Sequence, residues 1–175
     1  MPIWPFRRSR ASQDAERLLA AVTEASRRPS LFGAGRVPDT LEGRFELMTL
    51  NASLALVRLQ ADPALAPLAQ DFTDQLFRQF DAGLREAGVG DTSVPKRMQK
   101  MASAFYGRLQ AYGAAITGAD QMALSAALGR NFWGDEAHPF ASRLAAYAQT
   151  VTQAQLAGPA EAMFEAHGWP APAET

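Results

Sequence analysis

The feature that most constrains this chain is a stripe of large apolar residues between positions 94 and 116. The stripe consists of Val94, Met98, Met101, Phe105, Leu109, Tyr112 and Ile116, which recur at spacings of three and four. At about 100° per residue, this spacing places all of them on one side of an α-helix. The sequence therefore predicts a long amphipathic helix that turns this stripe toward the core.

A short turn leads into this helix. Gly88 follows the periodic pattern of the preceding segment and fits the position just after a helix, where glycine adopts the left-handed conformation at little cost. Gly90 and Asp91 continue the turn, and Pro95 fits a first helical turn because an N–H there would have no intrahelical partner. We expect Asp91 to hold Lys96 or to cap backbone N–H groups.

The rest of the chain shows further helical patterns separated by Pro and Gly breaks. We expect helices to begin near Ser12, Asp39, Pro67, Asp120 and Pro139, and a last short helix to contain Met163 and Phe164. No stretch alternates β-branched or aromatic residues with polar ones, so there is little material for a sheet. We predict an all-α protein, a single compact bundle of about six to seven helices with mixed crossing angles, packed around the helix at 94–116.

The chain has 175 residues, which is enough for one domain with a substantial core. We divide it into an N-terminal arm with a short, loosely attached helix (residues 1–36), a main helical domain (37–168) and an irregular tail (169–175). The tail assignment depends on its two prolines.

Charged residues lie among the apolar positions of the other helices. Two pairs, Asp74/Arg78 and Asp81/Arg85, have the i,i+4 spacing of ion pairs on a helix surface. Arg44, Glu46 and Arg58 leave two interpretations open, ion pairs within the fold or half-buried contacts with a partner.

The helix at 94–116 carries a basic side away from its apolar stripe. Lys96, Arg97 and Lys100 lie there, and Gly107 opens a flat spot one or two turns further along. This side could be an ordinary solvated helix surface, or it could bind an acidic or carbonyl-rich partner.

Composition excludes several classes of function. The chain has no cysteine, and its two histidines lack the spacing of a metal site or a recognisable acidic partner. The serines lack a nucleophile-elbow setting, and the Gly33-Ala34-Gly35 run follows no strand pattern, so it is not a dinucleotide loop. We therefore predict no metal, no cofactor and no catalytic residue.

The charge balance and hydropathy bear on partners and location. With a net charge of -1 and a pI of about 6.1, the chain shows no overall nucleic-acid footprint, and we expect no DNA binding. It has neither the apolar core of a signal peptide nor a run of about 18 apolar residues, which predicts a cytoplasmic protein. The aromatic and basic residues at 1–10 could touch an anionic membrane surface, or they could form a free arm.

Three runs of this sequence resemble the ubiquinol–cytochrome c chaperone family, which includes the mitochondrial cytochrome b assembly factor. The runs are LREAGVGDTSVPKRMQKMASAFYGRLQAY, RFELMTLNASLALVRL and LAQDFTDQLFRQFD. The resemblance covers about residues 38–155. The family pattern falls on Arg44, Glu46, Arg58, Asp74, Phe77, Asp81, Arg85, Glu86, Gly88, Gly90, Asp91, Lys96, Met98, Met101, Phe105, Tyr106, Gly107, Arg108 and Tyr112.

This resemblance implies a non-catalytic chaperone that assembles the cytochrome bc1 complex and binds newly made cytochrome b. It also implies a ribosome or a small helical protein as further partners. The short N-terminus fits a bacterial version on the cytoplasmic side of the inner membrane, where those further partners need not apply. The residues off the apolar stripe are the candidates for contact with the client: Lys96, Arg97, Lys100, Tyr106, Gly107 and Arg108.

Two alternatives come from other classes of protein. The first is a general helical adaptor or ribosome-associated module that binds RNA phosphate through Lys96, Arg97, Lys100 and Arg108, with strong salt dependence. The second is a cofactor-independent enzyme that holds a lipid or quinone between its helices, suggested only by the aromatic content.

Overall fold

The computed structural model describes residues 9–173, which form six α-helices and four short 3-10 helices. The α-helices are α1 (Arg10–Ser26), α2 (Leu41–Gln60), α3 (Ala66–Glu86), α4 (Val94–Thr117), α5 (Gln121–Trp133) and α6 (Pro139–Leu156). The 3-10 helices are η1 (Pro29–Leu31), η2 (Pro63–Leu65), η3 (Ala160–Phe164) and η4 (Ala166–Gly168). Residues 9–173 contain no strand, only an isolated bridge between Phe32 and Val37. The prediction of an all-α bundle of this size is confirmed.

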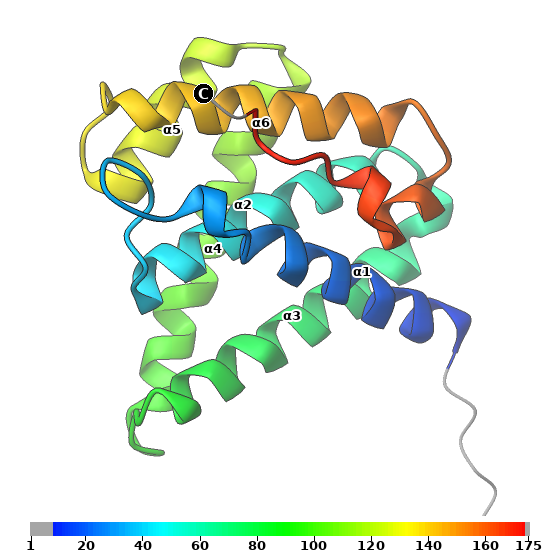
Figure 1. Cartoon of the computed structure of the whole chain (residues 1–175). Coiled ribbons are helices and arrows are strands. Elements are labelled where there is room, and N and C mark those ends of the chain that lie inside the picture. The colour runs from blue at the N-terminus through cyan, green and yellow to red at the C-terminus, as the bar shows by residue number, and fades with distance from the viewer. Residues whose placement is uncertain (1–8, 174–175) are drawn as a thin grey trace, which may run out of the picture.

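The helices pack in layers that cross at different angles. Figure 1 shows α5 and α6 along one edge of the molecule and α1 and α3 along the opposite edge, with α2 between them. Helix α4 runs from the end of α3 to the start of α5 and so connects the two edges.

The centre of the bundle is α2 and not α4, so the sequence-based prediction of the central helix is wrong. Helix α2 contacts all five other α-helices. It is buried on several sides, which is why its apolar residues do not form one narrow stripe in the sequence. In α4, by contrast, only Val94, Phe105, Tyr112 and Ala115 are buried.

Helix α1 is part of the core and is not loosely attached. Ala15, Leu18 and Val22 have no exposed surface, and the helix packs against α2 and α3. Its N-cap is Ser9 rather than Ser12, because the Ser12 N–H donates to the Ser9 hydroxyl at 3.0 Å. Residues 1–8, most of the expected N-terminal arm, lie outside the described part of the chain.

The segment after α6 also enters the core. The backbone after Trp169 is irregular as expected, but the Trp169 side chain is 1% exposed, and its indole N–H donates to the Met163 carbonyl at 2.8 Å. Arginines from the other end of the chain hold this segment. Arg28 donates to the carbonyl oxygens of Trp169 and Pro170, the latter at 2.7 Å, and Arg17 pairs with Glu165 at 2.5 Å.

One buried hydroxyl in α2 makes no hydrogen bond. Thr49 is fully buried and its Oγ1 has no partner among the described residues. A buried polar atom without a partner costs free energy, so Thr49→Val, which keeps the shape, should stabilise the protein by about 1 kcal/mol. Urea unfolding of the variant measures this gain.

The neighbouring Ser53 provides the control for that experiment. Its hydroxyl donates to the Thr49 carbonyl at 2.7 Å, so Ser53→Ala removes a formed bond and should not stabilise the protein. A Thr49→Val variant that unfolds at lower urea than the wild type would show that the threonine hydroxyl contributes to the fold.

Candidate functional site

The turn between α3 and α4 positions the basic end of α4. Gly88 has φ +81°, as predicted for the residue that follows a helix. Asp91 does not hold Lys96 as expected; its carboxylate binds Arg85, whose Nε also donates to Asp81 at 2.7 Å. Gly90 accepts hydrogen bonds from the N–H groups of Ser93 and Val94 and so shapes the start of α4. Because these ion pairs are exposed, they order the turn more than they stabilise it.

Lys96, Arg97 and Lys100 project from the first two turns of α4. All three are exposed, and none of their side chains has a hydrogen bond or ion pair with any other described residue. The first turn contains no acidic residue. Positive charge near a helix N-terminus is unfavourable by a few tenths of a kcal/mol or more, because the helix dipole is positive there. Lys96 and Arg97, in the first turn, therefore do not stabilise the helix through its dipole. We call Lys96, Arg97 and Lys100 the basic cluster; within residues 9–173 their side chains have no partner.

Tyr106 and Gly107 lie further along α4 at the surface. Tyr106 is 52% exposed, and its ring stacks on Phe77 with 5.9 Å between the ring centroids. Phe105, on the buried side, meets Tyr106 edge-on at 5.4 Å. A Cβ added at Gly107 would meet no atom within 4 Å, so this backbone is open. Tyr106 is thus a surface aromatic group fixed by the aromatic core beneath it.

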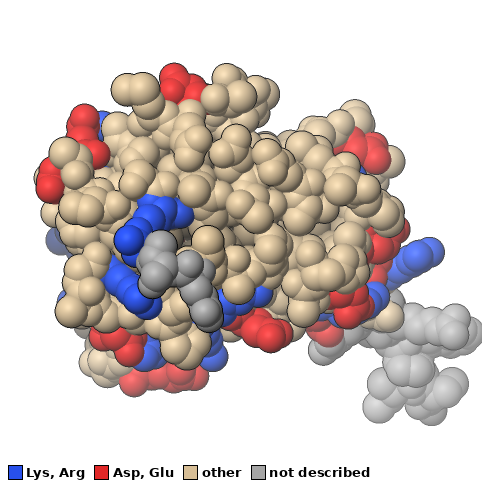
Figure 2. Space-filling model, turned by 45° about the horizontal axis from the view of Figure 1, so that its top comes forward, with Lys and Arg blue, Asp and Glu red and all other residues tan. Residues whose placement is uncertain are grey.

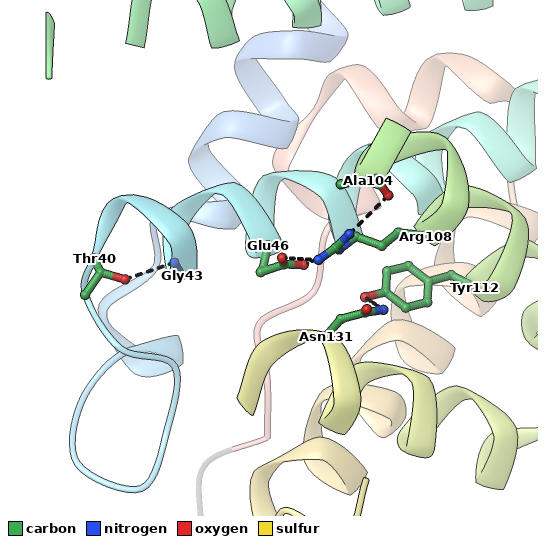
Figure 3. A network of polar contacts seen from close by, with 7 residues as sticks. All are labelled: Thr40, Gly43, Glu46, Ala104, Arg108, Tyr112 and Asn131. Atoms are coloured by element: carbon green, nitrogen blue, oxygen red, sulfur yellow. Dashed lines mark hydrogen bonds and ion pairs between the residues drawn. The ribbon is translucent and has the colours of Figure 1, made fainter. Parts of the chain in front are cut away.

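Arg108 is held inside the fold and does not belong to the free basic surface. Its Nε and Nη2 donate to the two carboxylate oxygens of Glu46 at 2.6 Å each, and its Nη1 donates to the Ala104 carbonyl at 3.2 Å (Figure 3). Only 18% of the Arg108 side chain and 10% of the Glu46 side chain are exposed. The bidentate pair joins α4 to α2, which makes Arg108 unsuitable as a contact for a client or for RNA phosphate.

The same region contains a buried tyrosine hydrogen bond. The Asn131 amide on α5 donates to the Tyr112 hydroxyl at 3.1 Å (Figure 3), and burial raises the pKa of Tyr112 well above its usual range. Burial also raises the pKa of Glu46, while the Arg108 guanidinium opposes that increase. Together these contacts fix α2, α4 and α5 around one polar cluster.

Three further charged residues of the family pattern, Arg44, Arg58 and Asp74, have partners within the fold. Arg44 binds Asp39 at 2.6 Å, and Thr40 rather than Asp39 caps α2, because its hydroxyl accepts from the Gly43 N–H at 3.1 Å. Arg58 donates to the Gln155 carbonyl at the end of α6 at 3.2 Å. Asp74 accepts from Gln70 at 2.9 Å, and the expected pair with Arg78 is absent from the described residues.

No group of side chains in residues 9–173 has the composition of a metal site, and no helix there combines the length and hydropathy of a membrane span.

The sequence analysis did not identify two apolar residues that the structure exposes. Met122 on α5 is 85% exposed and Leu156 at the end of α6 is 63% exposed. The sequence does carry a signal for them, because the only charged residue between 109 and 129 is Asp120, and 144–160 contains none.

Comparisons with known proteins give two matches. The family described as ubiquinol-cytochrome C chaperone matches residues 34–168. The chain is also similar to the crystal structure of the Cbp3 homolog from Brucella abortus, with 39% sequence identity and a TM-score of 0.78. The alignment covers 94% of this chain and 91% of that chain. No curated protein matches the chain.

Proposed function

Because the chain belongs to the ubiquinol-cytochrome c chaperone family, we propose that it is a non-catalytic assembly chaperone for the cytochrome bc1 complex that binds newly made cytochrome b. The match over residues 34–168 carries this proposal, since it includes α2, α3, α4, α5 and α6. We place the protein in the cytoplasm of a bacterium, at the inner face of the membrane where cytochrome b is inserted.

Within this role, the basic cluster on α4 is the proposed electrostatic contact. Three exposed cations whose side chains have no partner in the described part of the chain can pair with acidic groups of a client, or with anionic lipid headgroups next to it. Tyr106 and Gly107 extend this contact along the same helix, whereas Arg108 is left out because Glu46 already binds it.

The test combines deletion of the gene with complementation. Loss of the protein should lower the amount of assembled bc1 complex and its ubiquinol–cytochrome c reductase activity, and the wild-type gene should restore both. A variant with Lys96→Gln, Arg97→Gln and Lys100→Gln should fold normally and restore less complex, because only exposed, unpaired charges are removed. Native gel electrophoresis of solubilised membranes measures the assembled complex.

Three exposed arginines elsewhere provide a matched control. Arg27, the C-cap of α1, and Arg78 on α3 have no ion pair among the described residues, and Arg10 at the start of α1 makes only an exposed pair with Asp14 at 3.7 Å. All three can be changed together to Gln, with the same loss of charge. That variant should restore full assembly. Equal restoration by both triple variants would argue against the basic cluster, and unaltered bc1 levels in the deletion strain would contradict the function itself.

The exposed cations also favour one second candidate, a ribosome-associated adaptor that reads RNA phosphate. Such binding would weaken steeply between low and moderate salt, with a slope set by the number of phosphates contacted. Co-sedimentation with ribosomes across a salt series distinguishes it, since an assembly chaperone of the kind proposed needs no such interaction.

A further inference from the structure

A broad surface on α4, α5 and α6 is nearly free of charge. Apart from Arg108, which Glu46 holds internally, α4 carries no charged residue after Lys100. Residues 144–160 have none at all, and the carboxylate of Asp120 caps α5 by accepting from the Ala123 N–H at 2.9 Å. Figure 2 shows a wide area without Lys, Arg, Asp or Glu on the side that carries α5 and α6.

Two hollows lie on either side of the C-terminal half of α4. One, of about 180 Å³, lies between α4, α5 and α6 and is lined by Ile116, Leu124 and Gln149 among others. The other, of about 590 Å³, lies between α2 and α4, and Tyr106, Leu109 and Gly113 contribute to it. Among the described residues, Asp120 is the only charged one that lines either hollow. We call the two hollows and the surface around them the neutral face.

Large apolar side chains are close in sequence to residues that line these hollows. Met122 follows Gln121, which lines the smaller hollow, and Leu156 lies one turn beyond Gln153, which lines it too. With Tyr106 they are three of the four large hydrophobic side chains that are exposed in residues 9–173. Exposed apolar groups gathered around hollows mark a binding surface more often than an ordinary solvated one.

The lack of charge restricts what can occupy this face. A charged group buried there would lose its hydration without gaining a counter-ion, which costs several kcal/mol. An apolar helix has no such cost, because its backbone groups are already paired within the helix. The Gln amides at positions 110, 121, 149 and 153 keep the empty face hydrated and can pair with occasional polar side chains of the occupant.

The dimensions along α4 agree with such an occupant. Residues 101–117 of α4 cover about 25 Å at a rise of ~1.5 Å per residue, close to the ~30 Å hydrocarbon thickness that a membrane-spanning helix matches. The basic cluster stands at one end of this stretch, where the polar flank of such a helix would lie. Helix α4 is thus charged at its start and nearly uncharged after Lys100, as a membrane-spanning helix is charged at its flank and apolar in its middle.

We propose that the neutral face binds an apolar, membrane-spanning helix of the client before that helix is inserted. This inference rests on the proposed function and assigns a surface and a chemical class of partner to it. The basic cluster then contacts the flank of the helix, and the neutral face covers its apolar part.

The test introduces charge on the neutral face without a change in net charge. Met122→Glu lies near the N-terminus of α5 and Leu156→Lys at the C-terminus of α6, so each new charge suits its helix dipole and each site is already exposed. The control is Leu41→Glu with Ala82→Lys, two exposed positions on α2 and α3 that lie outside both hollows. Circular dichroism and thermal unfolding check that both double variants fold.

The probe is a fluorescent peptide with the sequence of one membrane span of the organism's own cytochrome b, held in mild detergent. We expect the wild type and the control to bind it alike and Met122→Glu/Leu156→Lys to bind about tenfold or more weakly, because each new charge must be desolvated. A peptide from a soluble loop should not bind the face, and the affinity for the span should change little with salt.

Unchanged binding of the span peptide by Met122→Glu/Leu156→Lys would overturn the proposal. A sedimentation result could also overturn it. If the wild type self-associates through this face, and self-association does not change peptide binding, the face is an interface between copies. Complementation separates this inference from the function. If deletion lowers bc1 levels but the charged variant restores them and binds the peptide normally, only the assignment of the face fails.

Discussion

Arg108→Met should destabilise the protein by roughly 3–5 kcal/mol at neutral pH, because it leaves the Glu46 carboxylate buried without a counter-ion. Methionine keeps much of the arginine volume, so the loss reflects charge rather than a cavity. Equilibrium unfolding in guanidinium chloride at neutral pH measures it. The double variant Glu46→Leu/Arg108→Met should recover most of the loss, since buried ion pairs can often be replaced by apolar residues at little cost.

The pH dependence of Arg108→Met identifies the cause. Burial raises the pKa of Glu46 in the folded protein, and the variant lacks the guanidinium that opposes this increase. A carboxyl group with a raised folded pKa contributes stability below its unfolded pKa and loses it as the pH rises through the folded pKa. The deficit of Arg108→Met should therefore be smallest in acid and grow toward neutral pH. A deficit that is the same at acid and neutral pH would contradict the assignment to Glu46.

Trp169→Ala should cost about 3–5 kcal/mol of folding free energy, the range found when a large aromatic side chain is removed from a core. Trp169 is 1% exposed and its indole is hydrogen-bonded to Met163, although a tail position suggests nothing of the kind. Thermal and denaturant unfolding measure the loss. Trp169→Phe retains most of the apolar contact, loses the indole bond, and should be intermediate.

Trp133 provides the comparison for Trp169, because it is the other tryptophan in residues 9–173. That residue is half-buried on α5, and its indole donates to the Arg36 carbonyl at 3.2 Å. Trp133→Ala should cost clearly less than Trp169→Ala. Equal costs for the two would mean that Trp169 does not hold the segment after α6 in the core.

The sequence was sufficient to predict the helices and the turn before α4, but it did not predict which helix lies at the centre of the bundle. The stripe from Val94 to Ile116 and the left-handed Gly88 are local patterns, and both are present in the structure. The burial of α2 depends on neighbours on several sides, which no single helical period displays. A single apolar stripe is most visible in the sequence of a helix that is buried on one side only. For that reason the sequence pattern indicated α4, and not α2, as the central helix.

The candidate site was predictable in the same partial way. Exposure of Lys96, Arg97 and Lys100 follows from their position off the apolar stripe. Arg108 lies off the same stripe, yet it meets Glu46 from a helix that is distant in sequence, and that pairing needs the tertiary fold. The division of the chain at residue 36 and the roles of the surface residues stay predictions.

The arginine contacts to the segment after α6 have a consequence for how the chain folds during synthesis. Arg28 and Trp169 are 141 positions apart, and Arg17 and Glu165 are 148 apart. At a translation rate of ~5–20 residues per second, the apolar side of α1 stays partly uncovered for many seconds before the segment after α6 is synthesised. Such long-range contacts also slow folding in general. A protein whose proposed work is to shield a nascent chain would thus itself begin as one that needs protection at the ribosome.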